Sequence, residues 1–319
     1  MKRSAILAVV IGLVLAVTLI ATNDFAKILD ALRQAGWGIA LVVLLHLPQT
    51  FASAIGWQEL LDRRAPVSRL YVLRWIRESV NALLPVAQIG GDLVRARLLA
   101  RRGPPLAPSL ASSMVDLSVE GATQAIFTIL CVALLIAGPH GGEAMTLAIG
   151  VTVASIAMAV AFVVAQRFGL FALIERSVAR WTKASDLSGL NAAVLALYRS
   201  PARLSRSAGW HLLSWLLGGI ETWAGLHVLG VHASLREAMV IEGLGQAVRG
   251  VGFLIPGALG VQEGGYLLIC AMFGIPPQQA LALSLIRRIR ELALGLPGLA
   301  VWHRMEARPL VGGVQEGLS

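Results

Sequence analysis

The apolar run 109–137 is long enough to cross a bilayer, yet it carries two carboxylic acids, Asp116 and Glu120. These residues are four apart, so a helix places them on one face together with Gln124. A polar stripe of this kind in a membrane helix faces the interior of the bundle, because charge is costly against lipid. We expect these carboxylates to orient arginines or to bind the cationic part of a ligand.

A second apolar run, 278–302, carries guanidinium groups instead. Arg287 and Arg290 stand among leucine, isoleucine and alanine, and Glu291 follows Arg287 at helical spacing. The planar guanidinium matches the oxygens of a phosphate with two parallel hydrogen bonds. The pattern predicts that both arginines bind phosphate, with Glu291 holding one edge of Arg287. Arg249 is a weaker candidate for the same role.

Proline and glycine interrupt the backbone beside these charges. Broken helices at membrane depth are tolerated where they line a protein cavity, and helix ends freed by a break direct their dipoles toward it. The residues expected to form the breaks are Pro85, Gly90, Gly91, Pro256, Gly257 and Gly260.

The second break repeats the first with an offset of 171 residues and without a gap. Proline, glycine, serine and acidic residues coincide, which chance matching of leucine and alanine does not explain. Interrupted hydrophobic segments in both halves of a chain are typical of transporter folds. We expect one integral membrane domain, 1–319, with repeat one at about 1–143 and repeat two at about 144–305. The coinciding positions are Leu83 and Leu254, Pro85 and Pro256, Asp92 and Glu263, Gly103 and Gly274, Pro105 and Pro276, Ser113 and Ser284, and Glu120 and Glu291.

The composition is that of an integral membrane protein. The 319 residues are 56% hydrophobic and 14% charged, with a formal charge of +9, and the mean hydropathy is +0.73. The two cysteines lie in apolar segments, and the six histidines are scattered without metal-ligand spacing, which favours ordinary packing roles. Positive charge spread over membrane loops, with no binding motif, argues against a nucleic-acid partner. No phosphate-binding loop or nucleophile elbow is present, and we expect no cofactor, no metal and no enzymatic activity.

The hydropathy and the distribution of arginine predict six spanning helices and two re-entrant broken elements. The first span is retained rather than cleaved as a signal peptide, because its apolar core is long and no cleavage site follows. The arginine-rich segment 62–77 is expected in the cytoplasm with both termini, whereas 138–143 and 231–234 are expected outside. A short mixed-charge loop is expected at 23–35, and the short helical runs 72–84 and 89–100 are expected to form the first re-entrant pair. The expected spans are 4–22, 36–61, 109–137, 144–166, 208–230 and 278–302.

This topology turns the two halves in opposite directions. The first broken element opens from the cytoplasm and the second from the periplasm, so the fold class is an all-α, polytopic inner-membrane bundle built as an inverted repeat. Such repeats place a binding site near the midplane, between the halves. A buried Asp116–Arg287 pair is expected there, and one alternative is that these charges only hold the helices together. The candidate substrate-binding residues are Asn81, Asp92, Arg95, Asp116, Glu120, Arg249, Glu263, Arg287, Arg290 and Glu291.

The motif N-x-L-x-P-x(4)-G-G-D-x-x-R at 81–95 resembles a signature of the lysylphosphatidylglycerol synthase transmembrane family, also called flippase-like. P-G-A-L-G-V-Q-E at 256–263, followed by Arg287, is similar to the second signature of that family. The resemblance extends over roughly residues 6–302, and a weaker one is to the branch associated with hopanoid biosynthesis. The chain departs from the family where Leu117 stands in place of an arginine between the acids of the third helix, which leaves the headgroup open.

The resemblance implies movement of a phosphate-bearing lipid between leaflets of the bacterial inner membrane, with aminoacyl-phospholipid, polyprenyl-linked or hopanoid-related substrates. The soluble aminoacyl-transferase domain of the synthases has no counterpart, so synthase activity is not implied. The alternative function is a membrane-embedded transferase or an accessory subunit that binds lipid without moving it. The expected partners are membrane lipid and proteins of lipid or envelope biosynthesis, and the sequence does not indicate an oligomeric state.

Overall fold

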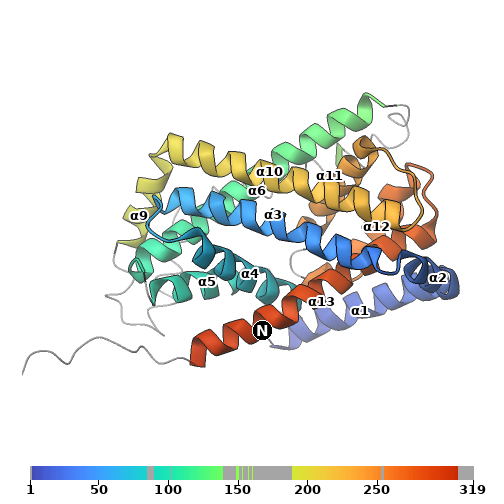
Figure 1. Ribbon diagram of the computed structural model, residues 1–319, viewed down its shortest axis with the longest axis horizontal. Helices are drawn as coiled ribbons and strands as arrows, with labels where there is room; N and C mark the ends of the chain where they lie inside the picture. Colours follow the sequence, from blue (N-terminus) through green and yellow to red (C-terminus); the bar gives the residue numbers. More distant parts are fainter. Residues whose placement is uncertain are drawn as a thin grey trace, which may run out of the picture.

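The computed structural model describes residues 2–84, 90–101, 103–138, 189–252 and 255–307, together with residues 149, 150, 153, 157 and 160. Every regular element in these ranges is a helix (Figure 1), which confirms the predicted all-α membrane bundle. The first half contains α1 (Lys2–Thr22), α2 (Phe25–Ala35), α3 (Gly38–Leu60), α4 (Val67–Leu83), α5 (Gly90–Ala100) and α6 (Leu106–Ile136). The second half contains α9 (Leu190–Tyr198), α10 (Pro201–Val228), α11 (Leu235–Val251), the 3₁₀ turn η2 (Pro256–Ala258), α12 (Val261–Ala271) and α13 (Pro277–Ala307).

Two of the described helices, α3 and α6, are long and apolar enough to cross a membrane. A third crossing results if α1 from Val10 onward and α2, which meet at 89°, are counted together. The helices α10 and α13 have 28 and 31 residues but are less apolar. The predicted span 144–166 lies largely outside the described residues, so the count of six spans remains a prediction.

The segment between the first two predicted spans is not the loop that its mixed charge suggested. It forms α2, which packs against α13 and buries Ile28, Ala31 and Ala35. These residues follow one another at intervals of three and four, which is the spacing of one helix face. The carboxylate of Asp24 caps the helix by accepting the backbone N–H of Lys27 at 3.4 Å.

The internal repeat recurs in the helix boundaries. Shifted by 171 residues, α5 falls on α12 and α6 falls on α13 at both ends, and α4 and α11 each have 17 residues. The packing follows the same pattern, because α4 lies on α13 while α11 lies on α6. Each half therefore completes its core with the long last helix of the other. The predicted boundary near residue 143 lies outside the described residues.

The helices α3 and α10 run side by side in opposite directions (Figure 1). Glu59, near the end of α3, bonds to Arg206 at 2.7 Å near the start of α10, and Ser53 bonds to Ser214 at 2.9 Å. Pro48 of α3 and Gly219 of α10 correspond at the 171-residue offset. A membrane crossed by α3 in one direction would therefore be crossed by α10 in the other, which agrees with the predicted inverted repeat.

The end of α4 lies against the interruption of the second broken element. At this interruption, Gly257 and Gly260 have φ of 60° and 76°, which a residue with a side chain rarely adopts. A Cβ added at Gly257 would lie 3.3 Å from the carbonyl oxygen of Ala82, at the end of α4. Pro85 and the rest of the first break, 85–89, lie outside the described residues, while Gly90 and Gly91 begin α5. The α4 end and η2 thus bring both halves to one place.

Candidate functional site

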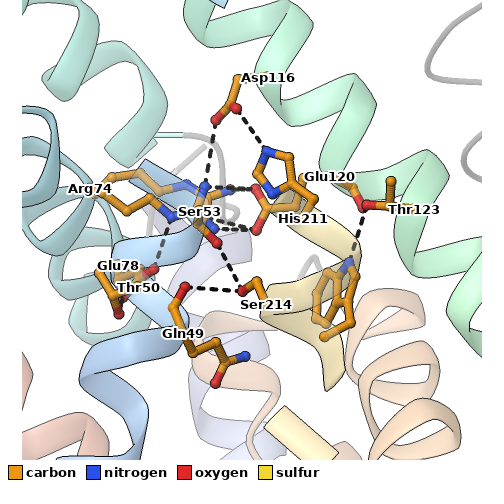
Figure 2. A network of polar contacts seen from close by, with 12 residues as sticks. Gln49, Thr50, Ser53, Arg74, Glu78, Asp116, Glu120, Thr123, His211 and Ser214 are labelled. Atoms are coloured by element: carbon orange, nitrogen blue, oxygen red, sulfur yellow. Dashed lines mark hydrogen bonds and ion pairs between the residues drawn. The ribbon is translucent and has the colours of Figure 1, made fainter. Parts of the chain in front are cut away.

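A network of charged side chains fills the space between α4, α6 and α10 (Figure 2). Arg74 of α4 donates to Glu78 one turn later at 2.9 Å and to Glu120 of α6 at 2.5 Å. The same guanidinium lies 3.5 Å from Asp116. Three carboxylates therefore surround one guanidinium, and the predicted placement of Asp116 and Glu120 on the interior face of their helix is correct.

Two further arginines join this network to α5. Arg95 is fully buried and bonds to Asp116 at 2.8 Å, and its guanidinium lies 4.4 Å from the ring centre of Trp57. Arg77 of α4 and Arg95 both contact Asp92, at 3.2 Å and 2.7 Å. Asp92 stands in the first turn of α5, where a carboxylate also interacts favourably with the helix dipole. The two arginines and Asp92 thus fix the short helix α5 against its neighbours.

Two histidines tie the halves together, although the sequence suggested only packing roles for them. His211 of α10 bonds to Asp116 at 2.8 Å (Figure 2). His46 of α3 lies between Glu221 of α10, at 3.0 Å, and Glu78 of α4, at 3.6 Å. Each ring therefore contacts a carboxylate on another helix and so links charged groups. The interpretation of these two histidines as ordinary packing residues is wrong.

The predicted phosphate-binding arginines of α13 are already paired. Arg287 contacts Glu242 of α11, and also bonds to Thr222 at 2.5 Å, while Arg290 contacts Glu221. Both guanidiniums are buried. The predicted Asp116–Arg287 pair is wrong, because each residue has its own partners in its own part of the bundle. Glu291 does not hold Arg287 either: it lies one turn further along the helix, but its carboxylate pairs with Arg249 and Arg288 instead.

A third group of charges surrounds the second break. Arg288 donates to the carbonyl oxygen of Gly257 at 2.6 Å and lies 3.1 Å from both Glu263 and Glu291. Arg249 of α11 reaches the same Glu291 at 2.5 Å. Glu263 also accepts the N–H of Gly260 at 2.7 Å and so caps α12. This cluster therefore holds the broken backbone in shape while presenting two guanidiniums around one carboxylate.

Some of these groups remain open to the outside while others are sealed. The side chains of Arg95 and Asp116 have no exposed surface, whereas Glu78 is 25% exposed, Arg249 18% and Arg288 16%. Glu78 and Arg249 occupy equivalent positions of the repeat. No group of three or more metal-binding side chains occurs among the described residues. A ligand could therefore be met by carboxylates from one half and guanidiniums from the other.

Asn81 and the glycine pair of the first motif have a structural role here. The amide oxygen of Asn81 accepts the N–H of Gly91 at 2.8 Å, which ties the start of α5 to the end of α4. A Cβ at Gly91 would lie 2.3 Å from the carbonyl oxygen of Arg77. Asn81 and Gly91 thus allow α4 and α5 to touch beside the break.

Sequence reasoning missed several charged residues of the site. Arg74 and Arg77 were expected at the cytoplasmic side because arginine is dense there, and although 72–84 was predicted to be helical, they were not expected in the core; both are buried in α4. Leu70, Leu73 and Ile76, interleaved with them at helical spacing and fully buried, are the signal that marks a core helix. The other members that were missed are Glu78, Glu242, Arg288, His46, His211 and Glu221.

Comparison with known proteins gives one match. Residues 5–298 match the family model described as the lysylphosphatidylglycerol synthase TM region. No curated protein and no solved structure matches the chain. The match covers both broken elements and all three charged groups.

Proposed function

The chain belongs to the lysylphosphatidylglycerol synthase transmembrane family, and from this we propose that it moves a lipid with a phosphate-bearing headgroup between the two leaflets of the inner membrane. The lipid is an aminoacyl-phospholipid, a polyprenyl-linked lipid or a hopanoid-related lipid, and no covalent chemistry is involved. Both termini lie in the cytoplasm, where proteins of lipid or envelope biosynthesis can reach them. The inverted repeat with two interrupted elements supports transport, because such folds alternate access around a central site.

The observation that carries this proposal is the pair of partly exposed guanidiniums at the second break. Arg249 and Arg288 share Glu291 as an acceptor, at 2.5 Å and 3.1 Å. A lipid phosphate can take the place of that carboxylate between them, since a phosphate offers the same paired oxygens and more of them. Arg287 and Arg290 are less suitable, because each is buried against a carboxylate of its own.

The carboxylates of the first half suit the cationic part of a headgroup. Glu78 is 25% exposed and Glu120 is 13% exposed, and they lie on two faces of the Arg74 guanidinium. The two halves approach one another here, because Gln124 of α6 donates to the carbonyl oxygen of Gln246 at 3.0 Å. A headgroup carrying both phosphate and amine thus has complementary charge on both sides of the repeat.

Reconstituted transport tests this assignment directly. The protein is placed in phosphatidylglycerol vesicles that contain a trace of fluorescent lysyl-phosphatidylglycerol, an aminoacyl-phospholipid, and dithionite quenching of the outer leaflet follows its movement. We expect Arg288→Gln to slow movement by about ten- to a hundredfold, which corresponds to the loss of a charge-assisted hydrogen bond of about 1.5–3 kcal/mol. Arg63→Gln is the matched control, because Arg63 is an exposed arginine outside both broken elements that also pairs with a carboxylate, Glu59, at 3.1 Å.

Two results would count against the proposal. An unchanged rate in Arg288→Gln, at equal protein density, removes the guanidinium from the site. A wild-type protein that binds the fluorescent lipid but never exposes it to dithionite is a lipid-binding accessory subunit or transferase rather than a flippase.

A further inference from the structure

His46 is the point where the charged groups of the two halves join. It lies on α3 two residues before Pro48, where α3 packs against α10. Nδ1 of its ring is 3.0 Å from Glu221 and Nε2 is 3.6 Å from Glu78. The imidazole therefore has an acidic oxygen opposite each of its nitrogens.

Both of these carboxylates are held in the charged form by arginine. Glu78 accepts from Arg74 at 2.9 Å, and Glu221 contacts Arg290. An ionised carboxylate can only accept hydrogen bonds, and a neutral imidazole has a single N–H. A neutral ring would direct the lone pair of its other nitrogen at a negative oxygen. Only the imidazolium form, with two N–H groups, matches both neighbours.

The groups around this ring carry one more negative charge than positive charge when His46 is neutral. In the first-half network, three guanidiniums (Arg74, Arg77 and Arg95) face four carboxylates (Glu78, Asp92, Asp116 and Glu120). On the other side of His46, Arg287 and Arg290 balance Glu242 and Glu221. A proton on His46 thus neutralises the carboxylate that remains without a cation.

His211 provides a contrast within the same network. Its Nε2 bonds to Asp116 at 2.8 Å. A neutral ring with its proton on that nitrogen satisfies this contact, so the geometry of His211 does not require a charge.

We propose that His46 binds a proton that holds α4 against α3 and α10, and, resting on the function proposed above, that release of this proton accompanies lipid movement. Glu78 belongs to the first broken element, while Glu221 belongs to α10 of the opposite half. Loss of the proton leaves Glu78 opposite a lone pair and weakens the contact between the two. Glu78 is 25% exposed, so water can reach the pair and carry the proton away. The protein would then be driven by a proton gradient.

Two measurements on the full-length protein in lipid nanodiscs test the proton site without any transport assay. In nitrogen-15 spectra of histidine-labelled protein at pH 7, the signals lost in His46→Gln identify His46, and we expect both of its nitrogens to carry protons. In Glu78→Gln we expect one proton only. Spin labels at the exposed positions Ser68 and Ser205, on α4 and α10, report their separation, which should lengthen as the pH rises in wild type and be insensitive to pH in His46→Gln.

The outcomes separate the two proposals. A singly protonated His46 in wild type at pH 7, or a label separation that does not respond to pH, overturns the proton site. If both expectations hold and fluorescent lysyl-phosphatidylglycerol still does not move, the proposed function fails while the proton site stands. Where lipid does move, an imposed pH gradient should change its rate several-fold in wild type and in the exposed-histidine control His227→Gln, and should have no effect in His46→Gln. A wild-type rate that ignores the gradient overturns the coupling.

Discussion

The charged group around Arg95 and the one around Arg288 are built on equivalent backbone, but they differ in access to the outside. Each has an acid in the first turn of its short helix, Asp92 in α5 and Glu263 in α12. Arg95 is fully buried, whereas the side chain of Arg288 is 16% exposed. The same scaffold thus carries one sealed set of ion pairs and one that a ligand can reach.

The difference arises because the arginines come from different elements. In the first half they belong to α4 and α5, and in the second to α11 and α13. At equivalent positions the sign of the charge is reversed, as in Asp116 and Arg287 or Glu78 and Arg249, while Glu120 and Glu291 agree. The repeat therefore shares its breaks and its helix-starting acids, but the two halves have unlike chemistry. We infer that the sealed ion pairs around Arg95 stabilise the fold, whereas the accessible group around Arg288 binds the ligand.

The largest effect is expected at the sealed set. Arg95→Ala removes the nearest cation from both Asp92 and Asp116 and leaves them only the more distant Arg77, at 3.2 Å, and Arg74, at 3.5 Å. Breaking a buried pair costs about 3–5 kcal/mol. We expect that loss in the free energy of unfolding, measured by denaturant titration in mixed micelles, and little protein in the membrane. Adding Asp116→Asn should recover part of it, because one of the two carboxylates is then replaced by a neutral amide.

Arg288→Gln is the matched comparison for that experiment. If this variant destabilises the fold as much as Arg95→Ala does, the two sets are equivalent and the division between them is wrong.

A smaller effect is expected where α4 and α5 touch. The repeat equivalent of Gly91 is Gln262, so only the first half requires a residue without a side chain. In Gly91→Ala the Cβ would lie 2.3 Å from the carbonyl oxygen of Arg77, and the backbone must move. Overpacking of this kind costs about 1–3 kcal/mol, which unfolding titrations can measure.

Gly121→Ala in α6 is the control, because nothing lies within 4 Å of a Cβ there. Alanine at this position should be neutral or should stabilise the helix by up to about 1 kcal/mol. If Gly91→Ala and Gly121→Ala change the free energy of unfolding equally, α4 and α5 do not touch closely at Gly91, and the first break has as much space as the second.

The sequence predicted the architecture better than it predicted the ion pairs. Hydropathy placed the spans 109–137 and 278–302 within five residues of the observed bounds of α6 and α13. Proline, glycine and acidic residues in fixed register mark backbone features, and backbone follows local sequence. The helix α2 was not predicted, because its apolar face is short and charged residues stand between the apolar ones.

Partners in the site depend instead on rotation of each helix about its axis. Arg287 and Arg288 are adjacent in sequence, yet one meets Glu242 of α11 and the other meets Glu263 of α12. A turn of 100° per residue separates their directions, and only the packed bundle decides which acid each one meets. The same reason explains why Arg74 and Arg77 were not expected in the core: 72–84 was predicted to be helical, but which face of that helix is buried depends on its packing.

The smallest effect on stability is expected at the end of α13, where ion pairs near the surface connect the two halves. Glu306 of α13 contacts Arg97 of α5 and Arg101, the residue after α5, with Arg101 at 2.6 Å. The repeat equivalent of Glu306 is Leu135, which is buried in the apolar core, so the opposite end has no such pair. Burial alone would raise the pKa of Glu306, but hydrogen bonds from Arg97 and Trp302 outweigh it and the pKa is lowered.

A lowered pKa in the folded state means that this contact stabilises the protein at neutral pH and is lost as the pH falls below the usual carboxyl range of about 4.3. We expect Glu306→Gln to lower the free energy of unfolding by about 0.2–1 kcal/mol at pH 7, less at high salt, because exposed pairs are weak and screened. The deficit should disappear on acidification, since wild-type Glu306 then becomes neutral as well. A deficit that persists in acid or in high salt would show that Glu306 acts through packing of its stem, as Leu135 does, and the two ends of the repeat would then be held by the same kind of contact.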